Sequence, residues 1–285
     1  MNKKLLAVAI AGALASPMAI ADVAVSGSIR VQLQGQQQAG GGTHFQVVDG
    51  TSRIRFKASE DLGNGSSAFA NYEFRVDAGK GSLVTGNTQR VTEVGIKGGF
   101  GRLGMGSQWS TLWGAVGNHI DLSNVYGGGA YLGQYRMNHS IKYSTNMGAM
   151  GLSVDVQMNT DTADDVDRAT VGLTGSVGAI NYGVGWQARA DSVNSGDYTG
   201  VGIGVKMGDL KFNAAWEDVD GVDTSTNVNI GRIAGVLLAY GKKDSGDGMF
   251  WANYHHSISK TVSVRLEARA QTDKNAASII LRKDF

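Results

Sequence analysis

The chain has 285 residues, and its 26 basic and 25 acidic side chains nearly cancel, so it lacks the positive excess of nucleic-acid-binding proteins. Glycine supplies 42 residues and proline only one; high glycine without proline excludes collagen-like and low-complexity chains. A hydrophobic content of 42% and the lack of cysteine indicate an ordered fold that does not depend on disulfides.

Residues 1–21 have the features of a signal peptide that is cleaved on export. Lys3 and Lys4 form a basic start, residues 5–15 are a short apolar run, and residues 19–21 read Ala-Ile-Ala, the small-x-small pattern that precedes a cleavage site. The apolar run is too short to span a bilayer. We therefore expect one mature domain over residues 22–285.

From residue 22 onward, apolar residues alternate with small or polar ones. Val23, Val25 and Ile29, for example, alternate with Ser28 and Arg30. A two-residue period is typical of a strand with one apolar face. The pattern predicts no helical stretch and sixteen strands, which lie near residues 23–33, 54–58, 68–76, 94–96, 103–105, 141–143, 152–156, 171–173, 182–186, 201–205, 210–216, 228–230, 236–240, 250–254, 262–268 and 277–285.

The connections between these strands alternate in length. Tight turns such as 60–65, 98–101 and 207–209 follow the even-numbered strands, whereas longer polar loops follow the odd-numbered ones, and 109–134 is the longest. Short turns at one end, long loops at the other and an even strand number are typical of an all-β transmembrane antiparallel β-barrel with short periplasmic turns and longer extracellular loops. Closure also removes the sheet edges that a bilayer cannot solvate.

The polar positions of the strands carry more basic than acidic residues, and most acids lie in the loops. This distribution favours a barrel with a basic inner wall over a secreted, soluble β-adhesin, which remains an alternative. The basic strand positions are Arg30, Arg53, Arg55, Lys57, Arg75, Lys97, Arg102, Arg136, Lys142, Lys211, Arg265, Arg269 and Arg282, and the acidic ones are Glu73, Glu93, Asp155, Glu217 and Glu267.

Several segments resemble the Gram-negative general porins, which are trimeric sixteen-stranded diffusion channels of the outer membrane. The resemblance runs from the signal peptide to the last residue, and its marks are Val25–Gly27, Glu60–Gly65, Gly95–Leu103, Asn138–Ser144 and the terminal Phe285. A terminal aromatic residue is similar to the signal that the outer-membrane assembly machinery recognises. One departure is Lys283, a lysine at a lipid-facing position, which can extend its ammonium group to the interface.

The resemblance implies that the third extracellular loop folds into the barrel and narrows it. In this sequence the loop is 109–134, with His119, Asp121, Asn124 and Tyr126 as its candidate residues. The opposing pore-lining basic wall is expected to comprise Arg30, Arg53, Arg55, Lys57, Arg75, Arg102 and Arg136. Asp121 is the one acid named in a loop where the family usually has several, so we expect a weak preference for anions.

The implied function is passive diffusion of small hydrophilic solutes and ions through a water-filled channel in the Gram-negative outer membrane. The implied partners are two further copies in a homotrimer, outer-membrane lipid and lipopolysaccharide, and the barrel assembly machinery; no cofactor, metal, nucleic acid or catalytic residue is expected. The Gly99–Gly104 match to G-x-G-x-x-G falls in a turn without a following helix. A phospholipase or protease barrel is the enzymatic alternative, although His44, His119 and His139 form no visible catalytic set.

Overall fold

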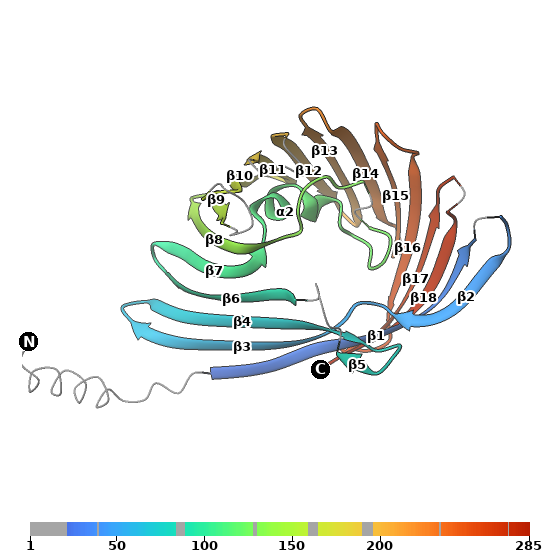
Figure 1. Ribbon diagram of the computed structural model, residues 1–285, viewed down its shortest axis with the longest axis horizontal. Coiled ribbons are helices and arrows are strands. Elements are labelled where there is room, and N and C mark those ends of the chain that lie inside the picture. Colours follow the sequence, from blue (N-terminus) through green and yellow to red (C-terminus); the bar gives the residue numbers. More distant parts are fainter. Residues whose placement is uncertain are drawn as a thin grey trace, which may run out of the picture.

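The computed structural model describes residues 22–38, 40–83, 89–127, 130–158, 165–189, 196–233, 235–272 and 274–285; the expected signal peptide lies outside them. One antiparallel sheet of eighteen strands closes on itself (Figure 1). Of the eighteen, β2 (Thr43–Asp49) continues β3 (Ser52–Gly63) along β1 (Asp22–Gln37), and β5 (Ser82–Leu83) continues β6 (Gln89–Gly98) along β4 (Ser66–Asp77), so the described residues form sixteen wall strands. The predicted sixteen-stranded barrel is therefore confirmed.

Each wall strand pairs with its sequence neighbours. The wall strands are β1 (Asp22–Gln37), β3 (Ser52–Gly63), β4 (Ser66–Asp77), β6 (Gln89–Gly98), β7 (Gly101–Trp109), β8 (Arg136–Met147), β9 (Met150–Gln157), β10 (Arg168–Val177), β11 (Ile180–Arg189), β12 (Tyr198–Met207), β13 (Leu210–Val219), β14 (Asp223–Ile233), β15 (Val236–Lys243), β16 (Met249–Ser257), β17 (Val262–Ala270) and β18 (Ala276–Asp284).

The first and last strands close the barrel. β1 pairs with β18 from Ser28 opposite Asp284 to Gln36 opposite Ala276. Next to the Ser28–Asp284 pair, the Gly27 amide donates to the Phe285 carbonyl at 2.8 Å, and the Phe285 amide donates back to the Gly27 carbonyl at 3.2 Å. The C-terminal aromatic residue thus lies at the seam of the barrel.

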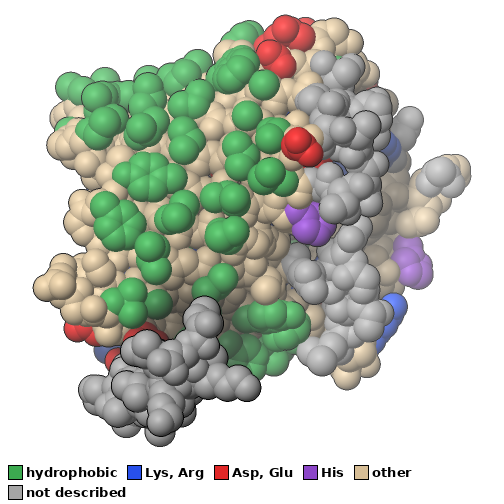
Figure 2. Space-filling model, turned by 60° about the vertical axis from the view of Figure 1, so that its left-hand side comes forward, with side chains coloured by type: hydrophobic (Ala, Val, Ile, Leu, Met, Phe, Trp, Pro, Cys, Tyr) green, Lys and Arg blue, Asp and Glu red, His purple; other side chains and the backbone are tan. Residues whose placement is uncertain are grey.

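The two faces of the wall differ in polarity. On β1, Ile29 and Leu33 point outward and are exposed, whereas Arg30 and Gln32 point inward and are buried. Figure 2 shows apolar side chains spread over the outer face. A soluble β-sandwich has the opposite arrangement, with its apolar face inside. Lys283, the one charged residue at an outward position of the last strand's alternating pattern, donates from its ammonium group to the Thr261 hydroxyl at 2.7 Å in the β16–β17 turn. This lysine therefore has a hydrogen-bond partner.

The structure differs from the sequence prediction in the loops. The loop after β7 contains a one-turn helix, α2 (Thr111–Ala115), and a 3₁₀ turn, η1 (Gly117–His119), although no helical stretch is predicted. The Ser110 side chain caps α2 by accepting from the Trp113 amide, and five residues are too few to show a helical period. The connection between the first two predicted strands, 23–33 and 54–58, contains β2. Among the described residues, no helix has the length and apolar composition needed to span a membrane.

We predict that Gly27→Ala weakens closure of the barrel. A Cβ at Gly27 would lie 2.5 Å from the Arg53 carbonyl oxygen and 2.6 Å from the Phe285 ring, and overpacking of this kind costs about 2 kcal/mol. The expected result is a lower temperature at which the folded, fast-migrating form is lost on a gel. Gly99→Ala is the matched control because a Cβ there meets no atom within 4 Å; equal losses in the two variants would contradict the prediction.

Candidate functional site

The connection between β7 and β8 lies inside the barrel. This inner loop, residues 110–135, carries α2 and η1; α2 contacts β10 and β11, and η1 contacts β12 and β13 (Figure 1). Glycines on the inner wall make this approach possible. A Cβ at Gly183 would lie 1.8 Å from the Ala115 carbonyl oxygen, and a Cβ at Gly202 would lie 2.3 Å from the His119 ring. Part of the high glycine content therefore gives the loop room.

Three buried carboxylates of the wall fix the inner loop at its start, its middle and its end. Asp155, Glu267 and Glu217 are 2%, 3% and 0% exposed. Asp155 accepts the backbone N–H of Thr111 at 2.6 Å. Glu267 accepts those of Asn124, Val125 and Tyr126 at 2.5, 2.7 and 3.3 Å. Glu217 accepts those of Leu132 and Gly133 at 3.1 and 3.2 Å. Buried backbone N–H groups need an acceptor within the protein, so these wall acids serve to hold the loop.

A cavity of about 540 Å³ separates the inner loop from the opposite wall. It is strongly basic, because one carboxylate, that of Asp121, faces six guanidinium groups among its described lining residues. These arginines are Arg30, Arg53, Arg90, Arg136, Arg265 and Arg282. Fixed charges of one sign in a confined space raise the local concentration of the opposite ion.

Ion pairs with wall carboxylates offset part of this excess, since Arg265 Nη1 lies 3.5 Å from Glu267 and Arg282 Nε lies 2.8 Å from Asp284. Glu73 on β4 is buried and is contacted by three arginines: Arg55 and Arg90 donate to it through their Nε atoms, and Arg53 Nη1 lies 3.8 Å away. One carboxylate thus faces three positive charges. The Arg136 guanidinium stacks over the Trp109 ring, 4.3 Å from its centroid, which orients the side chain without neutralising it.

The predicted basic wall residues lie in three places. Arg30, Arg53 and Arg136 line the 540 Å³ cavity, while Arg55 and Lys57 line an adjacent one of about 250 Å³. Two others are paired elsewhere. Arg75 Nε is 3.4 Å from Asp49, and Arg102 Nη2 is 2.6 Å from Glu93.

The four candidate residues of the loop divide into two pairs. Asp121 and Asn124 line the cavity, and Asn124 accepts from Arg30 Nη1 at 2.6 Å. His119 instead packs against β12 at Gly202, where burial lowers its pKa and favours the neutral ring. The Tyr126 hydroxyl lies 2.8 Å from Ser278 Oγ and accepts from Gln34 at 3.1 Å. His119 and Tyr126 therefore attach the loop to the wall.

Three cavity arginines are missing from the predicted pore-lining set. Arg265 and Arg282 lie at polar positions of the alternating pattern, so the pattern alone points to them. The pattern does not point to Arg90. Val94 faces outward, and in a regular strand Arg90, four residues earlier, would face the lipid as well. The β4–β6 pairing shifts register between Glu73 and Phe74, and this irregularity brings Arg90 into the cavity. Such a shift leaves no mark in the alternation.

The chain matches the family model for Gram-negative porins over residues 6–278. It belongs to the Gram-negative porin family. Major outer membrane protein P.IB of Neisseria meningitidis serogroup B is 36% identical over 121 residues, and the Neisseria gonorrhoeae protein of that name is 35% identical. The meningococcal match covers 39% of this chain and 35% of that protein, so the chain matches about a third of the length of these curated relatives. Both the family and these relatives place the chain in the outer membrane.

Solved porins share the fold at low sequence identity. The anion-selective porin from Comamonas acidovorans superposes with a TM-score of 0.78 at 16% identity, over 93% of this chain and all of that one. Salmonella typhi OmpF in complex with daunomycin gives a TM-score of 0.74 at 12% identity, over 92% of this chain and 97% of that one. At these identities the likeness shows the architecture of the barrel.

We predict that Glu267→Gln loosens the middle of the inner loop. The amide keeps one acceptor oxygen but places an NH₂ group against the amides of Asn124, Val125 and Tyr126, at a cost of about 3 kcal/mol. Single-channel recordings should show a current that fluctuates among several levels. Glu93→Gln is the control, since Glu93 pairs with Arg102 and Asn71 on the wall. A quiet current in Glu267→Gln would contradict the prediction.

We also predict that the ion preference depends on pH through Asp121. Burial raises the pKa of Asp121, while the charges of Arg136, Arg90 and Arg53 oppose the rise. A raised pKa means that the carboxylate becomes neutral at a higher pH than the usual value of about 3.9. As pH falls from 7, the anion-to-cation permeability ratio should therefore increase before an ordinary aspartate would titrate. In Asp121→Asn the ratio should be high already at pH 7 and flat over this window; a profile like that of the unmodified protein would contradict the assignment.

Proposed function

We propose that the chain forms a water-filled channel for passive diffusion of small hydrophilic solutes and ions across the outer membrane, with a preference for anions. The observation that carries the proposal is the cavity between the inner loop and the wall, where six arginines face Asp121. The field of these charges favours entry of anions, and the narrowed lumen limits passage to small solutes. The channel catalyses no reaction in this proposal.

The relatives support parts of the proposal. The Comamonas acidovorans structure is titled an anion-selective porin, and one match is the trimer form of OmpT from Vibrio cholerae, with a TM-score of 0.69 at 15% identity over 93% of this chain and 99% of that one. We propose that this chain is also a homotrimer in outer-membrane lipid and lipopolysaccharide. Phe285, which projects at the seam and is about half exposed, is proposed as the residue that the barrel assembly machinery reads.

The test is planar-bilayer recording from refolded residues 22–285, whose folding is verified by heat-modifiable migration. Discrete ohmic steps are expected, and a KCl gradient should give a reversal potential that favours chloride. A folded protein without steps, or a reversal potential that favours potassium, would contradict the proposal.

Arg136→Gln should reduce the chloride preference. Removing one charge about 10 Å from an ion changes its energy in water by about 0.4 kcal/mol, with opposite sign for chloride and potassium, so the permeability ratio changes roughly fourfold. Lys80→Gln is the control, because Lys80 is exposed in the β4–β5 turn and does not line the cavity. Equal reversal potentials for Arg136→Gln and the unmodified channel would show that Arg136 does not contribute to the chloride preference.

A further inference from the structure

The wall contains one extra residue beside the basic cavity. Along β1 from its N-terminus, the strand pairs with β3 as far as Ser28 opposite Arg53, and then with β2 from Val31 opposite Asp49. Two residues of β1, 29 and 30, thus face three residues, 50–52. This is a β-bulge with one inserted residue, a feature that redirects side chains next to functional sites.

The bulge decides which side chains face the lumen. In β2 the even-numbered Gln46 and Val48 lie opposite the inward Gln34 and Gln32 of β1. In β3 the odd-numbered residues lie opposite the even-numbered, inward-facing residues of β1, as Arg53 lies opposite Ser28. A shift of one residue moves a whole alternating set to the other face. The inserted residue therefore allows Arg53, and with it Arg55 and Lys57, to point inward.

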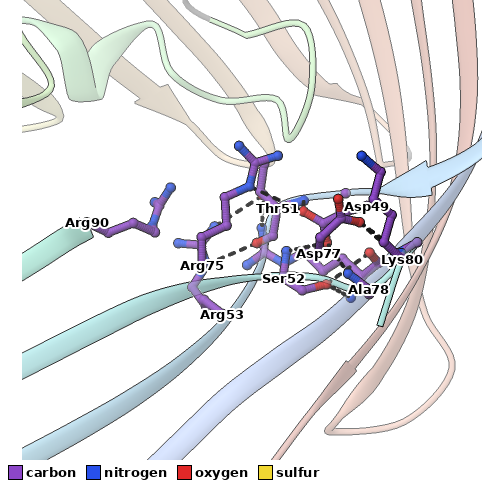
Figure 3. Close-up of polar contacts among 12 residues, drawn as sticks. Asp49, Thr51, Ser52, Arg53, Arg75, Asp77, Ala78, Lys80 and Arg90 are labelled. Carbon is purple, nitrogen blue, oxygen red and sulfur yellow. Dashed lines mark hydrogen bonds and ion pairs between the residues drawn. The ribbon is translucent and has the colours of Figure 1, made fainter. Parts of the chain in front are cut away.

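Thr51, in the middle of the bulge, has an uncommon backbone conformation. Its φ is +73°, and a β-branched residue rarely adopts positive φ. Asp49 stabilises it, since its carboxylate accepts the Thr51 and Ser52 amides at 3.0 and 2.9 Å and the Ala78 amide at 3.4 Å (Figure 3). The surrounding hydrogen bonds thus hold a conformation that is costly by itself.

The Ser52 side chain replaces the ladder bonds that the bulge interrupts. Its hydroxyl accepts from the Arg30 amide at 2.8 Å and lies 3.1 Å from the Arg30 carbonyl oxygen, to which it donates. Gly50 donates to the same carbonyl at 2.8 Å. These bonds fix the Arg30 backbone of β1 against the bulge.

Thr51 also holds the ends of two cavity arginines. Its hydroxyl oxygen accepts from Arg30 Nη1 and from Arg53 Nη2, each at 3.3 Å, and its carbonyl oxygen accepts from Arg53 Nε at 3.3 Å. Both arginines are more than nine-tenths buried and line the cavity together with Thr51. Two like charges from adjacent strands thus share one neutral acceptor.

We propose that Thr51 is a positioning residue that sets the anion preference by keeping the Arg30 and Arg53 guanidinium groups at the cavity, an inference that rests on the proposed channel function. The competing partner of Arg53 is Glu73, whose carboxylate lies 3.8 Å from Arg53 Nη1. Without the Thr51 hydroxyl, Arg53 turns toward Glu73, which displaces its charge from the cavity. The anion preference then falls although no charged residue has been removed.

Three variants separate the hydroxyl from the backbone strain. Thr51→Gly removes the hydroxyl and accepts positive φ freely. Thr51→Val removes the hydroxyl but keeps the branched shape, whereas Thr51→Ser keeps the hydroxyl without the branch. Each is refolded, checked for heat-modifiable migration and recorded in a KCl gradient beside the unmodified channel. If Thr51→Val fails to fold, Thr51→Gly and Thr51→Ser decide the question.

The expected result is an anion-to-cation permeability ratio about twofold lower in Thr51→Gly and Thr51→Val, less than for the loss of one nearby charge because the arginine is displaced and not removed, and an unchanged ratio in Thr51→Ser. An anion-preferring unmodified channel with equal ratios in all variants would overturn the role of Thr51 and leave the proposed function standing. A lowered ratio in Thr51→Ser as well would also overturn it, because the hydroxyl would then not be the determinant. A cation preference in the unmodified channel would contradict the proposed function and this inference together.

Discussion

Closure of the sheet between β1 and β18 is the constraint on which the other features of the structure depend. Backbone N–H and C=O groups in a lipid environment need partners within the protein, and a closed antiparallel sheet provides them without an open edge. The Gly27 and Phe285 backbones complete this pairing at the end of the chain. Once the cylinder is closed, its outer face must be apolar and its inner face must contact water.

Closure creates a lumen that the inner loop then divides. Glycines of β11 and β12 let the loop approach the wall, and Asp155, Glu217 and Glu267 bind its backbone amides. This use of the acids has an electrostatic consequence. These three carboxylates point at loop amides and do not line the cavity, so Asp121 is the one acid among its described lining residues, although Glu267 also pairs with the cavity arginine Arg265.

Departures from regular pairing refine this arrangement. The bulge at residues 50–52 turns the β3 arginine to the lumen, and the irregularity between β4 and β6 does the same for Arg90. Both lie at the level of the cavity, since Thr51, Arg53 and Arg90 all line it. A regular sheet would send some of these charges into lipid, so the irregular positions contribute directly to the charge of the lumen.

The sequence by itself determined the strand number and the closed barrel, because a two-residue period and the alternation of short and long connections are local properties of the chain. It also singled out the long loop 109–134. Only the tertiary structure decided that His119 and Tyr126 attach this loop to the wall while Asp121 and Asn124 face the cavity. Only the tertiary structure also showed that Arg90 faces the cavity and that the Thr51 hydroxyl accepts hydrogen bonds from two arginines. These features depend on which strands lie opposite one another and on where one residue is inserted, and such long-range pairings leave no periodic signal in the sequence.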